Sequence, residues 1–206
     1  MKLHQRLAML LSLIGGVATA QTVVISQVYG GGGNTGAVFA NDFVEVFNRG
    51  ATPVDLTGMS LQYASATGAG NFGGNSPVPL TGTLAPGQYR LVAMAGGAVG
   101  SPLPPADQAG SINLSGTAGK VVLVTGLTGL PCNGGSTPCS PSDQARIVDL
   151  VGYGSANFFE GSPAPALTNA TAALRAAGGC QDGNHNASDF STAGPNPRNS
   201  ASPAQP

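Results

Sequence analysis

The fold of this chain is decided by residues 41–48, which read Asn41-Asp42-Phe43-Val44-Glu45-Val46-Phe47-Asn48. Aromatic and β-branched residues, which favour strands, dominate this stretch. Because successive side chains of a strand point to opposite faces, Phe43, Glu45 and Phe47 share one face, while Val44 and Val46 share the other. Apolar side chains on both faces must be covered on both sides. The stretch is therefore typical of a central strand in a β-sandwich.

Similar strand-like runs recur along the chain between turn-rich spacers, at residues 22–29, 42–48, 59–64, 88–95, 120–125 and 146–153. Each run is bounded by Gly, Pro, Asn or Asp. Shorter runs at 54–56 and 111–114 are candidate edge strands. The pattern predicts an all-β, immunoglobulin-like β-sandwich with long Gly/Pro-rich loops. One short helix is predicted at 170–177, capped by Asn169 and stopped by two glycines.

The first twenty residues have the pattern of a secretory signal peptide. Lys2 and Arg6 precede the apolar run 7–17, which ends in Ala18-Thr19-Ala20. We expect cleavage near Gln21, secretion, and no membrane insertion afterwards, because no second apolar run of about 18 residues follows. Residues 21–199 are predicted to form one domain, and residues 200–206 a disordered tail.

Charged residues are scarce, at 8% of the chain. Removal of Lys2 and Arg6 leaves six Lys and Arg against nine Asp and Glu, a net charge of −3. The six cations are spread along the sequence and form no basic stripe of the kind that binds phosphate backbones. Any DNA binding should therefore be weak and lost at moderate salt.

The mature chain has three cysteines, and export would expose them to an oxidising compartment. Cys132 and Cys139 bracket a Gly/Ser/Pro loop and form the favoured disulfide. Closure of so short a loop is worth roughly 2.5 kcal/mol on the chain-entropy estimate, so the bond is a loop staple. Cys180 is left over, and could be buried, exchange with the other two or link to another chain.

Catalytic motifs are poorly supported. The run 31–36 matches a dinucleotide-binding glycine pattern, but the strand 42–48 follows it where a nucleotide-binding helix is needed. We interpret the run as a flexible or backbone-dense connection. His185 is the single histidine of the mature chain, and no Gly-x-Ser-x-Gly turn presents a nucleophile. We predict that the chain is not an enzyme, with no catalytic residues and no cofactor other than a candidate weak Ca²⁺.

The candidate calcium ligands lie in residues 182–189 and are Asp182, Asn184, Asn186 and Asp189. Alternating Asp and Asn oxygens in a tight loop can wrap Ca²⁺. Only two of these groups are anionic, however, and Asx turns that organise the loop internally explain the same residues, which is the interpretation we favour.

Glu45 lies within an apolar strand, where an unpaired carboxylate would be costly. A cation or backbone N–H groups usually compensate such a carboxylate. Arg175 is the candidate partner for a buried structural pair.

Several segments, taken in order, resemble the lamin-tail domain, an immunoglobulin-like β-sandwich found in nuclear lamins and in many exported bacterial proteins. The matching segments are residues 24–29, 41–48, 54–59, 84–89, 148–154, 173–175, 182–190 and 195–199. The chain departs from the family pattern at Gln27, where Glu is common, and at Met59, where Trp is common. The version that it most resembles precedes the catalytic domain of bacterial extracellular endonucleases, where it is an accessory module.

The resemblance implies an exported, non-catalytic module that binds a protein, a surface polymer or DNA outside the cell. The alternative is an accessory subunit or truncated relative of an extracellular endonuclease. We expect no nuclease domain after Pro206, so nuclease activity is not transferred from the resemblance. The sequence does not identify the ligand or the oligomeric state.

Overall fold

The stretch that begins at Asn41 forms strand β2 (Asn41–Asn48), inside a six-stranded sheet. The computed structural model describes residues 21–205. The predicted signal peptide, residues 1–20, lies outside the described residues. Both neighbours of β2, β1 (Val23–Tyr29) and β7 (Tyr89–Gly96), pair with it antiparallel. β2 is thus a central strand, as its sequence pattern predicts.

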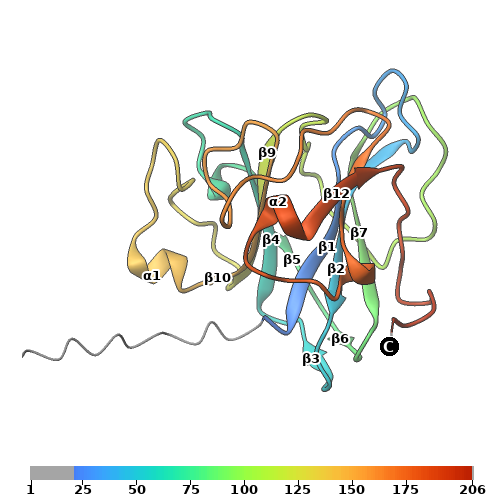
Figure 1. Cartoon of the computed structure of the whole chain (residues 1–206), viewed down its shortest axis with the longest axis horizontal. Coiled ribbons are helices and arrows are strands. Elements are labelled where there is room, and N and C mark those ends of the chain that lie inside the picture. The colour runs from blue at the N-terminus through green and yellow to red at the C-terminus, as the bar shows by residue number, and fades with distance from the viewer. Residues whose placement is uncertain (1–20, 206) are drawn as a thin grey trace, which may run out of the picture.

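The structure is built from two main sheets and one small one (Figure 1). The six-stranded sheet has the order β12-β11-β1-β2-β7-β8, and its remaining strands are β8 (Gln108–Ala109), β11 (Ala172–Arg175) and β12 (Phe190–Ala193). The four-stranded sheet has the order β10-β9-β4-β5, with β4 (Met59–Ser65), β5 (Val78–Pro79), β9 (Gly119–Thr125) and β10 (Ile147–Tyr153). The small sheet pairs β3 (Val54–Asp55) with β6 (Thr83–Leu84). All pairs are antiparallel except β7 with β8.

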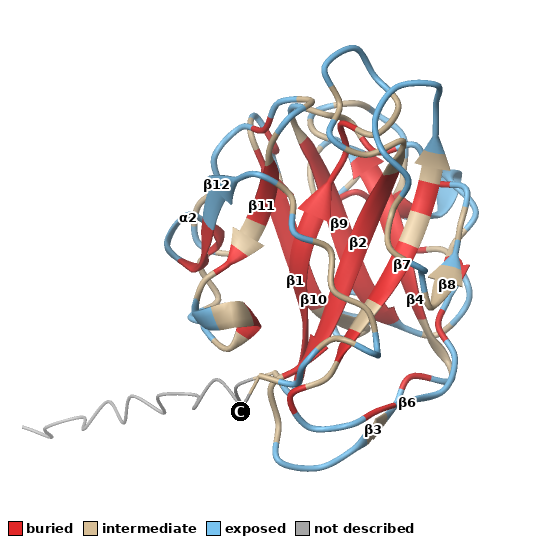
Figure 2. Cartoon of the chain, turned by 90° about the vertical axis from the view of Figure 1, so that its right-hand side faces the viewer, coloured by how far each residue is buried: buried red, intermediate tan, exposed pale blue. Residues whose placement is uncertain are grey.

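The main core lies between the two larger sheets. Val44 and Val46 of β2 belong to the same buried cluster as Leu61 of β4 and Val121 and Leu123 of β9. Figure 2 shows the buried central strands of both sheets, surrounded by exposed loops. Removal of this aliphatic surface from water supplies the main driving force for joining the sheets. The all-β sandwich prediction is confirmed.

The opposite face of β2 is covered by loops and by the C-terminal segment. The Phe43 ring lies 5.5 Å from the Tyr29 ring, and the Phe47 ring stacks on Tyr89 at 4.7 Å. The guanidinium of Arg198 in turn lies 3.8 Å from the centre of the Tyr89 ring. One face of β2 therefore packs on the second sheet, whereas its aromatic face is covered by irregular chain.

The predicted helix at 170–177 is wrong. Residues 172–175 form β11, which pairs with β1 on one side and with β12 on the other. Alanine-rich sequence favours helices locally, but pairing with two strands overrides that preference. The short helices that occur in residues 21–205 lie elsewhere, as α1 (Pro141–Gln144) and α2 (Asn186–Asp189), with 3-10 turns η1 (Phe72–Gly74) and η2 (Ala177–Gly179).

Two other segments differ from expectation. Residues 111–114 form no strand, although Ile112 is buried in the core and its carbonyl accepts a hydrogen bond from Ala95 N at 3.0 Å. Residues 200–205, predicted to be a disordered tail, pack on the β-sandwich, where Gln205 N donates to Gly87 O at 2.8 Å. Among residues 21–205, no helix has the length and apolarity needed to cross a membrane.

Candidate functional site

A buried guanidinium, that of Arg175 on β11, organises one edge of the sandwich. Its Nη2 donates to both carboxylate oxygens of Asp149 on β10, at 2.8 and 3.0 Å, and its Nη1 donates to Asp182 Oδ1 at 3.0 Å. Nε donates to the Ile25 carbonyl at 2.9 Å, and the guanidinium lies 4.5 Å from the centre of the Phe190 ring. The side chains of Arg175, Asp149 and Asp182 are all fully shielded from solvent. A planar, permanently charged fork of donors suits such a site better than a lysine would.

Carboxylates outnumber cations around Arg175. Asp149, Glu160 and Asp182 each place an oxygen within 4.8 Å of the other two, and Asp189 lies 3.9 Å from Arg175 Nη1. Burial, reinforced by the charge of Asp149, raises the pKa of Glu160 to about 8. Burial likewise raises the pKa of Asp149, against the lowering effect of Arg175. A cluster of three carboxylates has the donor chemistry of a hard-cation site, but here the Arg175 guanidinium already supplies a cation.

The two carboxylates among the four candidate calcium ligands, Asp182 and Asp189, accept hydrogen bonds from within the protein. Asp182 accepts from Arg175 and from Arg49 Nη1, the latter at 3.1 Å. Asp189 Oδ2 accepts backbone N–H groups of Gly183 and His185 at 2.9 and 3.0 Å. These bonds are the internal loop organisation that we favoured from sequence.

The other two candidates, Asn184 and Asn186, also take part in hydrogen bonds with backbone groups. Asn184 adopts a φ of 52°, in the left-handed region that asparagine tolerates, and its N–H faces Asp182 Oδ1. Asn186 is buried and bridges to the edge of β10: its Oδ1 accepts from Gly152 N at 2.9 Å, and its Nδ2 donates to the Leu150 carbonyl at 2.9 Å. Calcium binding by this loop remains a prediction.

Glu45 does not pair with Arg175, so the predicted buried pair is wrong. Its partner is Arg198, whose Nη2 lies 2.7 Å from Oε1 and whose backbone N lies 2.7 Å from Oε2. Ser26 also donates to Oε1, at 2.6 Å. Arg175 lies on β11, separated from β2 by β1, and uses its donors on other acceptors. The compensating cation therefore comes from the C-terminal segment.

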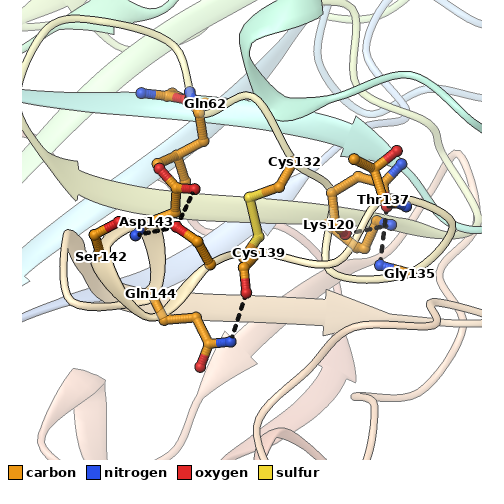
Figure 3. The surroundings of a disulfide bond; sticks show 12 residues. Gln62, Lys120, Cys132, Gly135, Thr137, Cys139, Ser142, Asp143 and Gln144 are labelled. Carbon is orange, nitrogen blue, oxygen red and sulfur yellow. Dashed lines mark hydrogen bonds between the residues drawn. A yellow bond between two sulfur atoms is a disulfide. The ribbon is translucent and has the colours of Figure 1, made fainter.

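The predicted disulfide joins Cys132 and Cys139, and Figure 3 shows it beside Lys120. Lys120 is completely buried, and its ammonium donates to the Asn133 carbonyl at 2.9 Å and to Asn157 Oδ1 at 2.8 Å. Burial lowers the pKa of Lys120. Asn133 Oδ1 also accepts the backbone N–H of Gly135. The loop is thus held by a covalent bond and by polar contacts to the neighbouring sheet.

Cys180 is a free, half-buried thiol. It lines a cavity of about 410 Å³ together with Phe47 and Arg49 of the β2 end and Ala204 and Gln205 of the C-terminal segment. The Arg49 guanidinium in the wall of this cavity is paired with Asp182. The pairing of Cys180 with another chain remains a prediction.

All six cations of residues 21–205 have partners within the chain. Arg49, Arg175 and Arg198 form ion pairs, and Lys120 is buried. The remaining two donate to backbone carbonyls, Arg90 to Thr83 and Arg146 to Thr125 and Thr128. The positive charge of the described chain is therefore largely committed to holding the fold.

Two exposed valines lie on a pair of loops, which we call the valine tip: residues 30–40 with Val38, and residues 97–101 with Val99. The side chains of these residues are exposed by 39% and 41%. Ser101 N donates to the Val38 carbonyl and Ala40 N donates to the Ser101 carbonyl, both at 2.8 Å, and Gly33 forms a β-bridge to Val99. The tip lies at the end of the molecule opposite β3 and β6 (Figure 1).

The glycine run explains why these two loops can lie so close together. A Cβ on Gly32 would lie 2.0 Å from the backbone of Asn41, and one on Gly33 would lie 2.2 Å from Gly97 N. Gly33 also has a φ of +71°, which favours glycine. The run is a backbone-dense connection, one of the two interpretations that we took from sequence.

Several of these contacts are not predicted by the sequence. Arg198 is the partner of Glu45, and Asp149 and Glu160 lie beside Arg175. In each case the residues that meet are not neighbours in the sequence. Glu160 carries no motif, and its surroundings appear only in three dimensions. The valines of the tip lie in loop sequence, where isolated apolar residues are common and carry no signal by themselves.

A model of the family described as Lamin Tail Domain matches residues 17–155. No curated protein matches the chain. Among solved structures, the chain is similar to the crystal structure of a DUF4876 family protein from Bacteroides thetaiotaomicron VPI-5482, with a TM-score of 0.49 and 14% sequence identity. That similarity covers 84% of this chain and 71% of the other chain.

Proposed function

The chain belongs to the lamin tail domain family, and from this premise we propose that it is an exported, non-catalytic module that binds a protein or a surface polymer outside the cell through the valine tip. The observation that carries the proposal is the exposure of two valines on loops that hydrogen bonds brace against each other. A braced loop loses little conformational entropy when it binds, which favours recognition by a preformed surface.

The commitment of the charged groups supports an uncharged mode of recognition. Arg175, Arg198 and Lys120 are buried or paired inside the sandwich, and the acids nearest to them are their partners or lie in the same clusters. Contacts of the tip would therefore be made by aliphatic side chains and by loop backbone groups. Interfaces of this kind have an apolar centre with a polar rim.

The test is an array of secreted proteins, surface polymers and nucleic acids, probed with the purified mature chain. We expect saturable binding to at least one protein or polymer. The double variant Val38→Ser/Val99→Ser should weaken that binding by about tenfold for each valine that the complex buries. Thermal unfolding of the variant should be almost unchanged, because both side chains are exposed.

Leu127→Ser is the matched control. Leu127 is also an exposed aliphatic residue, at 53%, but it follows β9 at the β3 and β6 end, where Gly126 N donates to Gly58 O. This variant should bind as the parent does. Equal losses in both variants, or no saturable ligand in the array, would contradict the proposal.

The nuclease-related alternative is tested with the same protein. A DNA zymogram should show no clearing by the purified chain. Clearing that a chelator abolishes would overturn the non-catalytic proposal and would direct attention to Asp149, Glu160 and Asp182, whose oxygens lie closest to one another.

A further inference from the structure

The N-terminal residue of the exported chain, Gln21, lies in a setting that favours a covalent modification. The predicted signal peptide ends in Ala18-Thr19-Ala20, so cleavage after Ala20 would expose Gln21 with a free α-amine. An α-amine and a side-chain carboxamide on the same glutamine can close into a lactam ring. We propose that Gln21 cyclises to pyroglutamate after export, which goes beyond the binding function proposed above and shares with it only the assumption of export.

The structure leaves the side-chain carboxamide oxygen of Gln21 without a competing partner in residues 21–205. This oxygen, Oε1, is buried and accepts no hydrogen bond there. The next residue is held in place, because the Thr22 carbonyl accepts from Arg49 N at 2.9 Å before β1 begins. The residue directly after Gln21 is therefore fixed in position.

The cavity beside Gln21 is largely apolar. Gln21 lines a cavity of about 600 Å³ whose other walls are mainly the aliphatic side chains of Val23, Val54, Met59, Ile147 and Val148. An α-amine that lies against these side chains would be penalised in its charged form. Arg49 Nη1 also lies 3.5 Å from the Gln21 carbonyl, and its charge is paired with Asp182. The neutral lactam avoids that penalty, and the cavity has room for the ring.

The reaction needs no oxidant or second substrate. The lone pair of the α-amine attacks the side-chain Cδ, and a bond forms between that nitrogen and Cδ. The bond between Cδ and Nε2 breaks, and the departing nitrogen takes a proton from the α-amine and leaves as ammonia. The former Oε1 stays on the ring as the lactam carbonyl oxygen.

The test uses the full chain with its own leader, expressed in a bacterial host that exports proteins and purified from outside the cytoplasm. Intact-mass spectrometry should give the mass of residues 21–206, with the Cys132–Cys139 disulfide formed, less one ammonia. Amine-reactive labelling of the N-terminus should fail, and a pyroglutamyl peptidase should release one residue and leave Thr22 first. The variant Gln21→Ser, processed at the same bond, should keep its full mass and accept the label.

An uncyclised Gln21 terminus, a chain that begins at any other residue, or an uncleaved leader would each overturn the proposal. An uncleaved leader would also count against the export that both proposals assume. Binding by the valine tip is tested independently by the array, because the tip lies among the loops opposite β3 and β6, whereas Val54 of β3 lines the Gln21 cavity. Failure of the modification and failure of the binding function are therefore separable.

Discussion

Glu45 stands in the middle of the aromatic face of β2, between Phe43 and Phe47, and it is completely buried. Its charge is compensated by Arg198, whose guanidinium also donates to the Tyr89 hydroxyl at 2.7 Å and covers the Tyr89 ring. Burial raises the pKa of Glu45, and Arg198 opposes that rise. One arginine thus ties the C-terminal segment to the centre of the larger sheet.

We expect Arg198→Met to lower the free energy of unfolding by about 3–5 kcal/mol, because it leaves Glu45 buried without its cation. Urea denaturation followed by circular dichroism measures the change. Arg146→Met is the matched control, since Arg146 donates only to exposed backbone carbonyls. The double variant Glu45→Gln/Arg198→Met should recover part of the loss, whereas equal losses for Arg146 and Arg198 would contradict this account.

Glu160 makes the stability of the protein depend on pH. Burial raises its pKa from 4.5 to about 8, so the folded chain holds this proton more tightly than the unfolded chain does. Its contribution to stability is therefore complete below pH 4.5 and is lost as the pH rises through about 8. Asp42, with a pKa raised to about 6 by burial, contributes with the same sign at lower pH.

The variant Glu160→Gln, which mimics the protonated carboxyl, should be more stable than the parent near pH 8 and should show a smaller fall in melting temperature between pH 6 and 8. Its Oε1 can still accept the Asn186 amide hydrogen bond seen at 3.3 Å. Differential scanning calorimetry across this pH range measures the effect. Asp55→Asn, at an exposed acid, should change the slope little, and an unchanged slope for Glu160→Gln would refute the assignment.

At the scale of elements, the loop that follows β9 is held from two sides. Cys132 and Cys139 are buried with Phe72 and Leu130 in an apolar cluster on the outer side of the four-stranded sheet, and the disulfide closes the loop. Gln144 of α1 donates to the Cys139 carbonyl at 2.9 Å, so the helix position depends on the loop (Figure 3). The disulfide staples one loop and does not join the two sheets.

Reduction of this disulfide should cost about 2.5 kcal/mol of unfolding free energy and leave the β-sandwich folded. Urea denaturation of the Cys180→Ala variant, with and without reductant, measures the difference without thiol exchange from Cys180. The far-ultraviolet circular dichroism of the reduced form should match that of the oxidised form. Loss of the β signal on reduction would show that the disulfide supports the whole fold.

Element β11 shows why local preference can mislead. Residues 172–175 read as helix formers, but Ala172 and Ala173 are fully buried, and the strand lies between β1 and β12. Small side chains allow close packing at this edge of the sheet, and Arg175 at the strand end reaches Asp149 on β10. The strand places the buried guanidinium, so the charge network depends on a tertiary pairing that the local sequence does not encode.

For the whole molecule, the pairing and burial of Lys and Arg side chains predict weak association with DNA. Four of the six cations in residues 21–205 are ion-paired or buried, and the other two contact only backbone carbonyls, so few counterions would be released from a phosphate backbone. Fluorescence anisotropy with a labelled duplex should show weak binding at low salt and none at moderate salt. Tight binding that persists at high salt would show that surface charge is a poor guide for this protein.

Much of the architecture could be predicted from the sequence. The strands predicted at 22–29, 42–48, 59–64, 88–95, 120–125 and 146–153 all occur within one residue of the predicted bounds at each end. Strand alternation is a local property, because one face of each strand is buried and its side chains repeat every second residue. The disulfide could also be predicted, because its two cysteines are close in sequence. The structure joins them.

By itself, the sequence determined that the chain forms a β-sandwich with a buried central strand at 41–48, because apolar periodicity and turn residues act over short distances. Only the tertiary structure decided that Arg198 compensates Glu45, that Arg175 meets Asp149 and Asp182, and that two valine-bearing loops form one tip. Charge compensation and loop bracing depend on which distant segments become neighbours. That choice is made by the packing of the whole chain, and no local pattern records it.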